Sequence, residues 1–261
     1  NWNLKPLHRL IVTSAVYRQA SRPTNPDWPR DVRAAARASW SRAVEADPPN
    51  YYLARFPRRR LSGEAIRDAM LAVSGVLDLR QGGPGVRPPL PAELVQTLLK
   101  NQWNVSPNEA DHYRRSLYVF ARRNLRYPIF EAFDRPDGNA SCPRRSRSTT
   151  APQSLLLLNS ELTLDAARRL AGAVQARTEN ADEAVVLAFR RALGRMPSPD
   201  ERRMMREFLD TQRDLLRKEA RPPNQLALPV PLAAGADPLE SAALTDLCLA
   251  LMNATEFLYV D

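Results

Sequence analysis

The sequence predicts a mainly α-helical protein, a multi-helix orthogonal bundle with long proline-rich loops and at most one short β-hairpin. Three observations support this prediction. The 261 residues include 23 prolines but only nine glycines, and tight hairpin turns depend on glycine. Asp137-Gly138 is the only Asn-Gly or Asp-Gly pair in the chain. Several segments repeat apolar residues at the spacing of an amphipathic helix, which is about 3.6 residues per turn.

Five helices are expected in order along the chain. Apolar stripes place the first from about residue 4 to Arg22-Pro23 and the second from Ser62 to about residue 77. A third is expected from Asn180 to about residue 193, where Asn180 resembles the N-cap of a capping box. The segment from Leu239 to Phe257 is apolar on most faces, which favours a central, buried helix.

The fourth helix in chain order has the clearest start. Ser198-Pro199-Asp200-Glu201 combines an N-cap serine, a proline at the first helical position and a glutamate three residues after the cap. Together these form the pattern of a capping box. The helix is expected to bury one stripe of side chains: Met205, Phe208, Leu209, Gln212 and Leu215.

Proline-rich connectors are expected at residues 22–30, 82–90 and 221–238. The glycines of 82–90 are not followed by the Lys-Ser/Thr of a phosphate-binding loop, so no nucleotide site is expected there. Residues 116–121 are β-prone and alternate in polarity, which makes them the candidate hairpin.

We expect residues 1–261 to form a single mostly helical domain. It can be subdivided into N-terminal helices at 1–112, an arginine-rich motif loop at 113–160 and a C-terminal helical bundle at 161–261. The chain has no initiator methionine and no signal peptide, so we expect a C-terminal fragment of a longer protein. No apolar run reaches the roughly 18 residues that a membrane span requires.

The net charge of +9 points to an anionic partner. Residues 113–147 carry nine arginines against three acidic residues, a local charge of +6. The planar guanidinium group matches phosphate, sulfate or carboxylate. A solvent-facing charged surface, or arginines buried in ion pairs with carboxylates, would account for the same cluster.

The loop from Asp134 to Thr150 concentrates the candidate site residues. Five residues of the loop could bind an anion: Arg144, Arg145, Ser148, Thr149 and Thr150. The remaining motif residues are Asp134, Asp137, Asn139 and Cys142. In the structural alternative, Asp134, Asp137 and Asn139 cap turns, while Arg144 and Arg145 pair with carboxylates such as Glu131 or Glu161.

A second basic cluster precedes the helix that starts near Ser62. It consists of Arg55, Arg58, Arg59 and Arg60, and we interpret it as a docking surface. Glu64 and Asp68 are alternative partners for these arginines. The neighbouring aromatic residues Tyr51, Tyr52 and Phe56 are expected mainly in the core, and stacking on a ligand is the alternative.

The thiols and histidines do not form a recognisable metal, haem or redox motif. Cys142 and Cys248 are the only cysteines, and His8 and His112 are the only histidines. No cofactor or metal is therefore expected in this chain. A disulfide between the two cysteines remains open, and a nucleophilic Cys142 would require His8 or His112 as its base. No catalytic motif is recognisable, so enzymatic activity stays undecided.

The motif loop also carries a family resemblance. The run from Asp134 to Arg145, with Thr149–Gln153 and Leu157–Glu161, resembles the planctomycete-specific domain of unknown function at the C-terminal end of large exported, cytochrome-c-associated proteins. The likeness extends over nearly the whole chain, including Leu193-Gly-Arg195 with Glu201 and the segment Asn253–Tyr259. The resemblance implies an exported protein, periplasmic or cell-surface, with haem c in an upstream domain. It implies no activity.

Three classes of function follow. The favoured one is a non-catalytic interaction or scaffold domain that docks on upstream domains of the same polypeptide and binds an anionic polysaccharide, sulfated or carboxylated. The alternative is an active-site loop contributed to a hydrolase or oxidoreductase assembled with those domains, with Cys142 or the Asp134/Asp137 pair as reactive groups. Nucleic-acid binding ranks last, because the sequence has the charge but no recognition motif.

Overall fold

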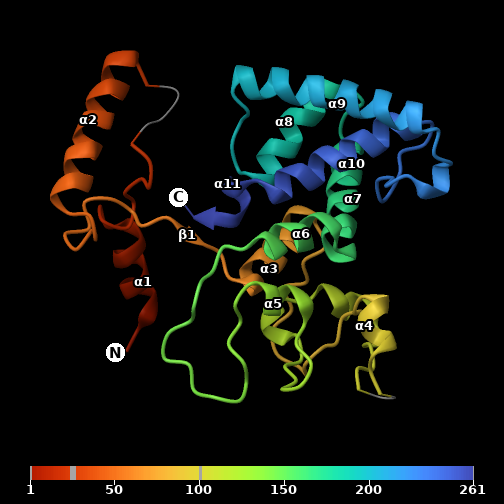
Figure 1. Ribbon diagram of the computed structural model, residues 1–261, viewed down its shortest axis with the longest axis horizontal. Coiled ribbons are helices and arrows are strands. Elements are labelled where there is room, and N and C mark those ends of the chain that lie inside the picture. Colours follow the sequence, from red (N-terminus) through yellow and green to blue (C-terminus); the bar gives the residue numbers. More distant parts are fainter. Residues whose placement is uncertain (1, 24–27, 100–101, 261) are drawn as a thin grey trace. The chain divides into compact units, whose positions relative to one another are not determined.

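The computed structural model describes residues 2–23, 28–99 and 102–260, and the protein is mainly helical, as predicted (Figure 1). The expected connector at 22–30 lies partly outside these described residues. The helices and strands are α1 Leu4–Thr13, α2 Arg30–Ala46, β1 Arg59–Arg60, α3 Gly63–Val73, α4 Ala92–Gln96, α5 Pro128–Ala132, α6 Ala151–Asn159, α7 Glu161–Gln175, α8 Ala181–Ala192, α9 Pro199–Glu219, α10 Pro238–Asn253, α11 Thr255–Leu258 and β2 Tyr259–Val260. Short 3₁₀ helices span Glu109–Tyr113, Ser116–Tyr118 and Pro223–Gln225.

The chain divides into two compact units. Unit 1 comprises Asn1–Arg60 and Tyr259–Asp261, and unit 2 comprises Leu61–Leu258. The expected subdivision at residues 112 and 160 stays a prediction. In unit 1, β1 pairs with β2 in an antiparallel register that sets Arg59 opposite Val260. In unit 2, the first and last residues meet, because the Leu61 amide donates to the Leu258 carbonyl at 2.8 Å.

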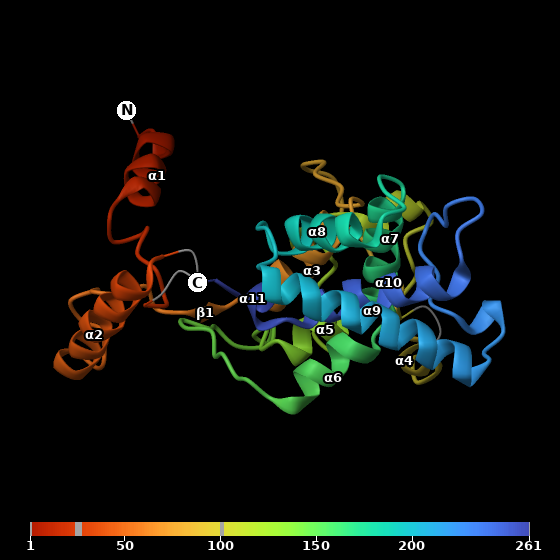
Figure 2. The ribbon, with the colours of Figure 1, turned by 90° about the horizontal axis from the view of Figure 1, so that it is seen from above.

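Helix α10 is the central helix of unit 2, as its all-round apolar sequence predicts. It packs against α6, α7, α8 and α9, and Figure 2 shows α9 lying along it. Leu247, Cys248 and Met252 are fully buried on it. Because burial occurs on several faces, the helix supplies the centre of the hydrophobic core rather than one of its walls.

The predicted helix starts at Ser198 and Asn180 are confirmed. Ser198 Oγ accepts a hydrogen bond from the Glu201 amide at 3.2 Å, and the Glu201 carboxylate accepts from the Ser198 amide at 2.7 Å. These two bonds form the capping box of α9. Asn180 accepts from the amides of Asp182 and Glu183 and so caps α8.

The stripe expected to be buried on α9 is shifted in the structure. Leu215, expected inside, is 46% exposed, and Leu216 is the buried residue. Met205, Phe208, Leu209 and Gln212 are half-buried. Residues 205 and 216 are 11 positions apart, which is close to three helical turns, so Leu216 lies within about 20° of Met205, whereas Leu215 is rotated by about 80° from Met205, to the edge of the stripe.

The expected hairpin at residues 116–121 is wrong. Residues Ser116–Tyr118 form a 3₁₀ turn, and Val119 forms an isolated parallel bridge with Val86. The Val86 amide donates to the Tyr118 carbonyl, and the Phe120 amide donates to the Val86 carbonyl, both at 2.8 Å. The backbone hydrogen bonds of Tyr118 and Phe120 are therefore made with the proline-rich segment 82–90, and not with a neighbouring strand of a hairpin.

The first expected helix is also shorter than predicted. Helix α1 ends at Thr13 instead of near Arg22, because Ser14 adopts an extended conformation. The hydroxyl groups of Thr13 and Ser14 hydrogen-bond to preceding carbonyls of the last turn, Arg9 and Ile11, at 2.7 and 2.8 Å. Serine and threonine side chains commonly compete with the helix in this way.

Candidate functional site

Unit 1 exposes an apolar helix stripe. On α1, the side chains of Leu4, Leu7, Leu10 and Ile11 are between 47% and 69% exposed. Neither α1 nor α2 contains a buried residue. The sequence predicts this stripe correctly, but the structure shows that the described residues do not cover it. Exposed apolar patches of this kind mark interaction surfaces.

The charge of the protein is concentrated in the same unit. From the sequence, unit 1 carries twelve basic and five acidic residues, a formal charge of +7, whereas unit 2 carries +2. Arg30, Arg33 and Arg37 follow one another along α2 at helical spacing and are exposed or half-buried. The arginine cluster at 113–147 is therefore offset by acidic residues elsewhere in unit 2, and the uncompensated charge lies in unit 1.

The four arginines expected to form a docking surface have different environments. Arg55 closes the end of α2, since its guanidinium donates to the carbonyls of Asp47 and Pro48 at 3.0 and 2.6 Å. Arg60 is buried. Arg58 lies 4.8 Å from the centre of the Tyr259 ring, and like Arg59 it is exposed. Arg58 and Arg59 are therefore the exposed members of this cluster.

Two aromatic residues beside this cluster were expected in the core, and that expectation is wrong. Tyr51 and Tyr52 are 83% and 87% exposed. Their backbone amides donate to the Asp47 carboxylate at 3.0 and 2.8 Å. These bonds fix the turn in a conformation that leaves both rings exposed to solvent. Hydrogen bonds from Tyr52 and Tyr51 lower the pKa of Asp47. Phe56, in contrast, is half-buried against Tyr17.

The motif loop between α5 and α6, the long green excursion in Figure 1, is closed at its base by hydrogen bonds. Asp134 accepts two hydrogen bonds from Ser148, from its amide and from its hydroxyl, each at 2.7 Å. Thr150 and Gln153 form the capping box that begins α6. Asp134, Ser148 and Thr150 thus have structural roles. Thr149 is exposed beside them.

The tip of this loop, residues 137–147, is exposed throughout. Asp137 caps a turn by accepting from the Asn139 amide at 3.0 Å, as the structural alternative predicts. Arg145 pairs with a carboxylate, as the structural alternative predicts, but the partner is Glu64 at 3.1 Å and not Glu131 or Glu161. The guanidinium groups of Arg144 and Arg147 form no hydrogen bond or ion pair within the described part of the chain.

Cys142 and Cys248 are both free thiols, so the structure contains no disulfide between them. Cys142 is exposed, and its thiol donates to the Arg144 carbonyl at 3.3 Å. No hydrogen bond connects it to His112. Among the described residues, no group of three or more histidine, cysteine or acidic residues could hold a metal ion.

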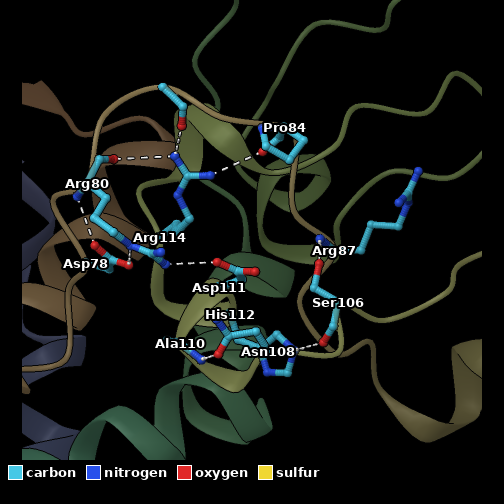
Figure 3. A network of polar contacts seen from close by, with 11 residues as sticks. Asp78, Arg80, Pro84, Arg87, Ser106, Asn108, Ala110, Asp111, His112 and Arg114 are labelled. Atoms are coloured by element: carbon cyan, nitrogen blue, oxygen red, sulfur yellow. Dashed lines mark hydrogen bonds and ion pairs between the residues drawn. The ribbon is translucent and has the colours of Figure 1, made fainter.

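Other arginines of the 113–147 cluster form hydrogen bonds inside unit 2 and stabilise its fold. Arg114 is buried, stacks 3.9 Å from the centre of the Tyr118 ring and donates to the carbonyls of Arg80, Gly82 and Pro84 (Figure 3). Arg80 in turn pairs with Asp78 and Asp111 at 2.6 and 2.9 Å. Internal pairing, one of the interpretations left open by the sequence, therefore accounts for part of the cluster.

A cleft that the sequence did not predict lies in unit 2. It encloses about 630 Å³ between α3, α5, α7, the 3₁₀ helix at Glu109–Tyr113 and the proline-rich segment 88–91. Arg67 and Tyr127 lie at its buried floor, and Glu109 and Glu161 lie on its exposed rim. The only indication of this cleft in the sequence is the density of prolines, which by itself predicts a connector.

Two of the segments that carry the family resemblance meet at Arg195. Its guanidinium binds Glu201 at 2.7 and 2.8 Å and Glu256 at 2.6 and 2.7 Å. These bonds from Arg195 lower the pKa of Glu201 to about 2. The arrangement joins the start of α9 to α11, so its role is structural.

The fold and these surfaces define a mainly helical two-unit domain with a strongly cationic, partly apolar surface on unit 1. The chain matches the family model PSD1, described as Protein of unknown function (DUF1553), over residues 1–209, and it belongs to this family. No significant match was found among curated proteins or among solved structures. None of the described helices combines the length and the apolar composition that crossing a membrane requires.

Proposed function

We propose that this domain is a non-catalytic interaction module that docks through unit 1 onto a protein surface with an apolar centre and acidic surroundings. The observation that carries the proposal is the uncovered leucine stripe of α1 on a unit of charge +7. The family resemblance suggests the partner, namely upstream domains of the same exported polypeptide, periplasmic or cell-surface, one of which would carry haem c.

Two physical arguments support a protein partner. A helix of ten residues is marginal in water unless its apolar face is packed against another surface. Burying one leucine side chain stabilises a complex by roughly 1.5–3 kcal/mol. The surrounding arginines and the exposed tyrosines Tyr51 and Tyr52 are residue types enriched at interfaces, and the positive charge favours an acidic partner surface.

Replacing Leu7 and Leu10 together by serine is expected to weaken binding to the separately expressed upstream domains at least about tenfold, because two anchors of the stripe are lost. Calorimetric titration measures the affinity, and thermal unfolding checks that the domain stays folded. The matched control replaces Leu155 and Leu158 by serine, since these leucines of unit 2 are similarly exposed. Equal effects of the two double variants would reject α1 as the docking surface.

A second candidate function is anion binding by the tip of the motif loop. It is favoured by the exposed guanidinium groups of Arg144 and Arg147 and by the exposed Arg145, which is engaged only by one surface ion pair. A flexible sulfated or carboxylated glycan is the ligand that such a row of arginines would suit.

Replacing Arg144 and Arg145 by alanine is expected to lower the affinity for heparin about tenfold without unfolding the domain, because surface ion pairs contribute at most about 1 kcal/mol to stability. Affinity is measured at about 0.15 M salt, with uncharged dextran as the negative control. The variant Arg190→Ala/Arg202→Ala removes the same charge from exposed positions outside the loop. An equal loss in this control would mean that heparin senses only overall charge, and unfolding of the loop variant would make its arginines structural.

A further inference from the structure

We propose that the cleft in unit 2 binds a small ligand with an apolar body and a cationic group. This inference is independent of the docking function, because all lining residues belong to unit 2. Its volume of about 630 Å³ lies within the range of small-molecule sites, which is roughly 300–1,000 Å³. The argument for the ligand class comes from the lining.

The walls of the cleft are apolar and rigid. Leu71 and Ile129 are buried in its floor, and Leu156 and Leu162 are half-buried at its side. The remaining apolar lining includes five prolines: Pro88, Pro89, Pro91, Pro107 and Pro128. Proline rings lose little conformational freedom when a ligand binds, so such a wall is suited to a ring or an aliphatic chain.

One side of the cleft carries a chain of polar contacts. Arg169 donates to Asp165 at 2.8 Å and to the Tyr113 hydroxyl at 2.7 Å, and this hydroxyl donates to Glu109 at 3.1 Å. Asp165 therefore neutralises Arg169. Glu109 receives a hydrogen bond from a neutral phenol, since burial raises the pKa of Tyr113 and keeps it protonated.

Glu161 is the second acidic group at the rim. It is exposed in the first turn of α7. No cation pairs with Glu109 or Glu161 within the described part of the chain. In a protein of net charge +9, this opening thus presents two carboxylates that form no ion pair within the described residues. An amine or guanidinium on the ligand would supply the missing charge, whereas an anion would be repelled.

The floor of the cleft is formed in part by a buried arginine. Arg67 is fully buried and donates from Nη1 to the Arg114 carbonyl at 2.9 Å and from Nη2 to the His112 carbonyl at 2.6 Å. Its Nε–H is buried and has no acceptor among the described residues. Arg67 thus closes the floor, and the carboxylates of the rim supply the polar groups that select the ligand.

The test compares three probes that share one body, 3-phenylpropylamine, 3-phenylpropanol and 3-phenylpropanoate, by saturation-transfer NMR and titration of the full chain. We expect the amine to bind about five- to tenfold more tightly than the alcohol at low salt, and the acid to bind most weakly. The difference should shrink at 0.5 M salt, because both rim carboxylates are solvent-exposed. Absence of binding by all three probes, or equal affinity for amine and acid, would overturn the proposal.

Variants locate the binding. Glu109→Gln combined with Glu161→Gln should reduce the affinity for the amine to that for the alcohol and leave the alcohol unchanged. Glu207→Gln, an exposed glutamate of α9 outside the cleft, is the matched control. Leu162→Trp should fill the cleft and abolish binding of amine and alcohol alike. If the rim variant keeps its preference for the amine, or if the folded Leu162→Trp protein still binds, the probes occupy another site and the inference is wrong.

Discussion

Replacing Arg67 by methionine is expected to destabilise unit 2 by about 3 to 5 kcal/mol, the largest effect of any single substitution proposed for this protein. The guanidinium is fully buried and serves three acceptors, the carbonyls of His112 and Arg114 and the hydroxyl of Ser116. Methionine fills most of the volume but leaves these acceptors without a donor. Each buried polar group that loses its partner costs about 1 to 3 kcal/mol.

Urea denaturation followed by circular dichroism measures this loss. Arg67→Lys should be intermediate, since an ammonium group keeps the charge but cannot reproduce the fork of the guanidinium. Arg190→Met, at an exposed position in the same unit, should change the free energy of unfolding by less than about 0.5 kcal/mol. Wild-type stability of Arg67→Met would show that the acceptors are satisfied by water and that Arg67 does not hold the segment 112–116.

Replacing Gly172 by alanine is expected to destabilise unit 2 by about 2 to 3 kcal/mol, although alanine is the better helix former. A Cβ atom at this position of α7 would lie 2.5 Å from the Val230 carbonyl oxygen and 2.9 Å from that of Pro231. The connector cannot retreat easily, because the Val230 amide donates to the Arg168 carbonyl at 2.9 Å and Arg168 Nε donates to the Leu228 carbonyl at 2.6 Å.

Thermal unfolding of Gly172→Ala tests this contact. The control is Gly138→Ala in the exposed loop, where the nearest atom to an added Cβ is Arg123 Cγ at 3.7 Å and no loss is expected. A Gly172→Ala protein as stable as the wild type would mean that the connector at 228–231 moves away from α7 without cost.

Local patterns explain how much of the fold could be predicted. Capping at Ser198 and Asn180, and the all-round apolar sequence of α10, each depend on residues close together in the chain. The burial of Arg67 depends instead on acceptors 45 to 49 residues away. No local pattern in the sequence distinguishes such an arginine from a solvent-facing one.

The candidate site, too, could be predicted only where it depends on residues close together in the chain. Charge density selected the loop at 134–150, and the structure assigns Asp134, Ser148 and Thr150 of that loop to its own closure. The apolar stripe of α1 was visible as a pattern, but a pattern specifies a face and not what covers it. The cleft draws its lining from segments between Arg67 and Arg169, so only the fold brings these residues together.

The meeting of Leu61 and Leu258 has a topological consequence. Because unit 2 starts and finishes at one hydrogen-bonded pair, it has the connectivity of an inserted domain, interrupting unit 1 between β1 and β2. Adjacent termini of this kind are what circular permutation requires. Joining Leu258 to Leu61 by a short linker and opening the chain in the exposed loop at 137–147 would therefore preserve every core helix of unit 2. Cutting after residue 209, where the family match ends, would instead remove α10 from the core that it centres.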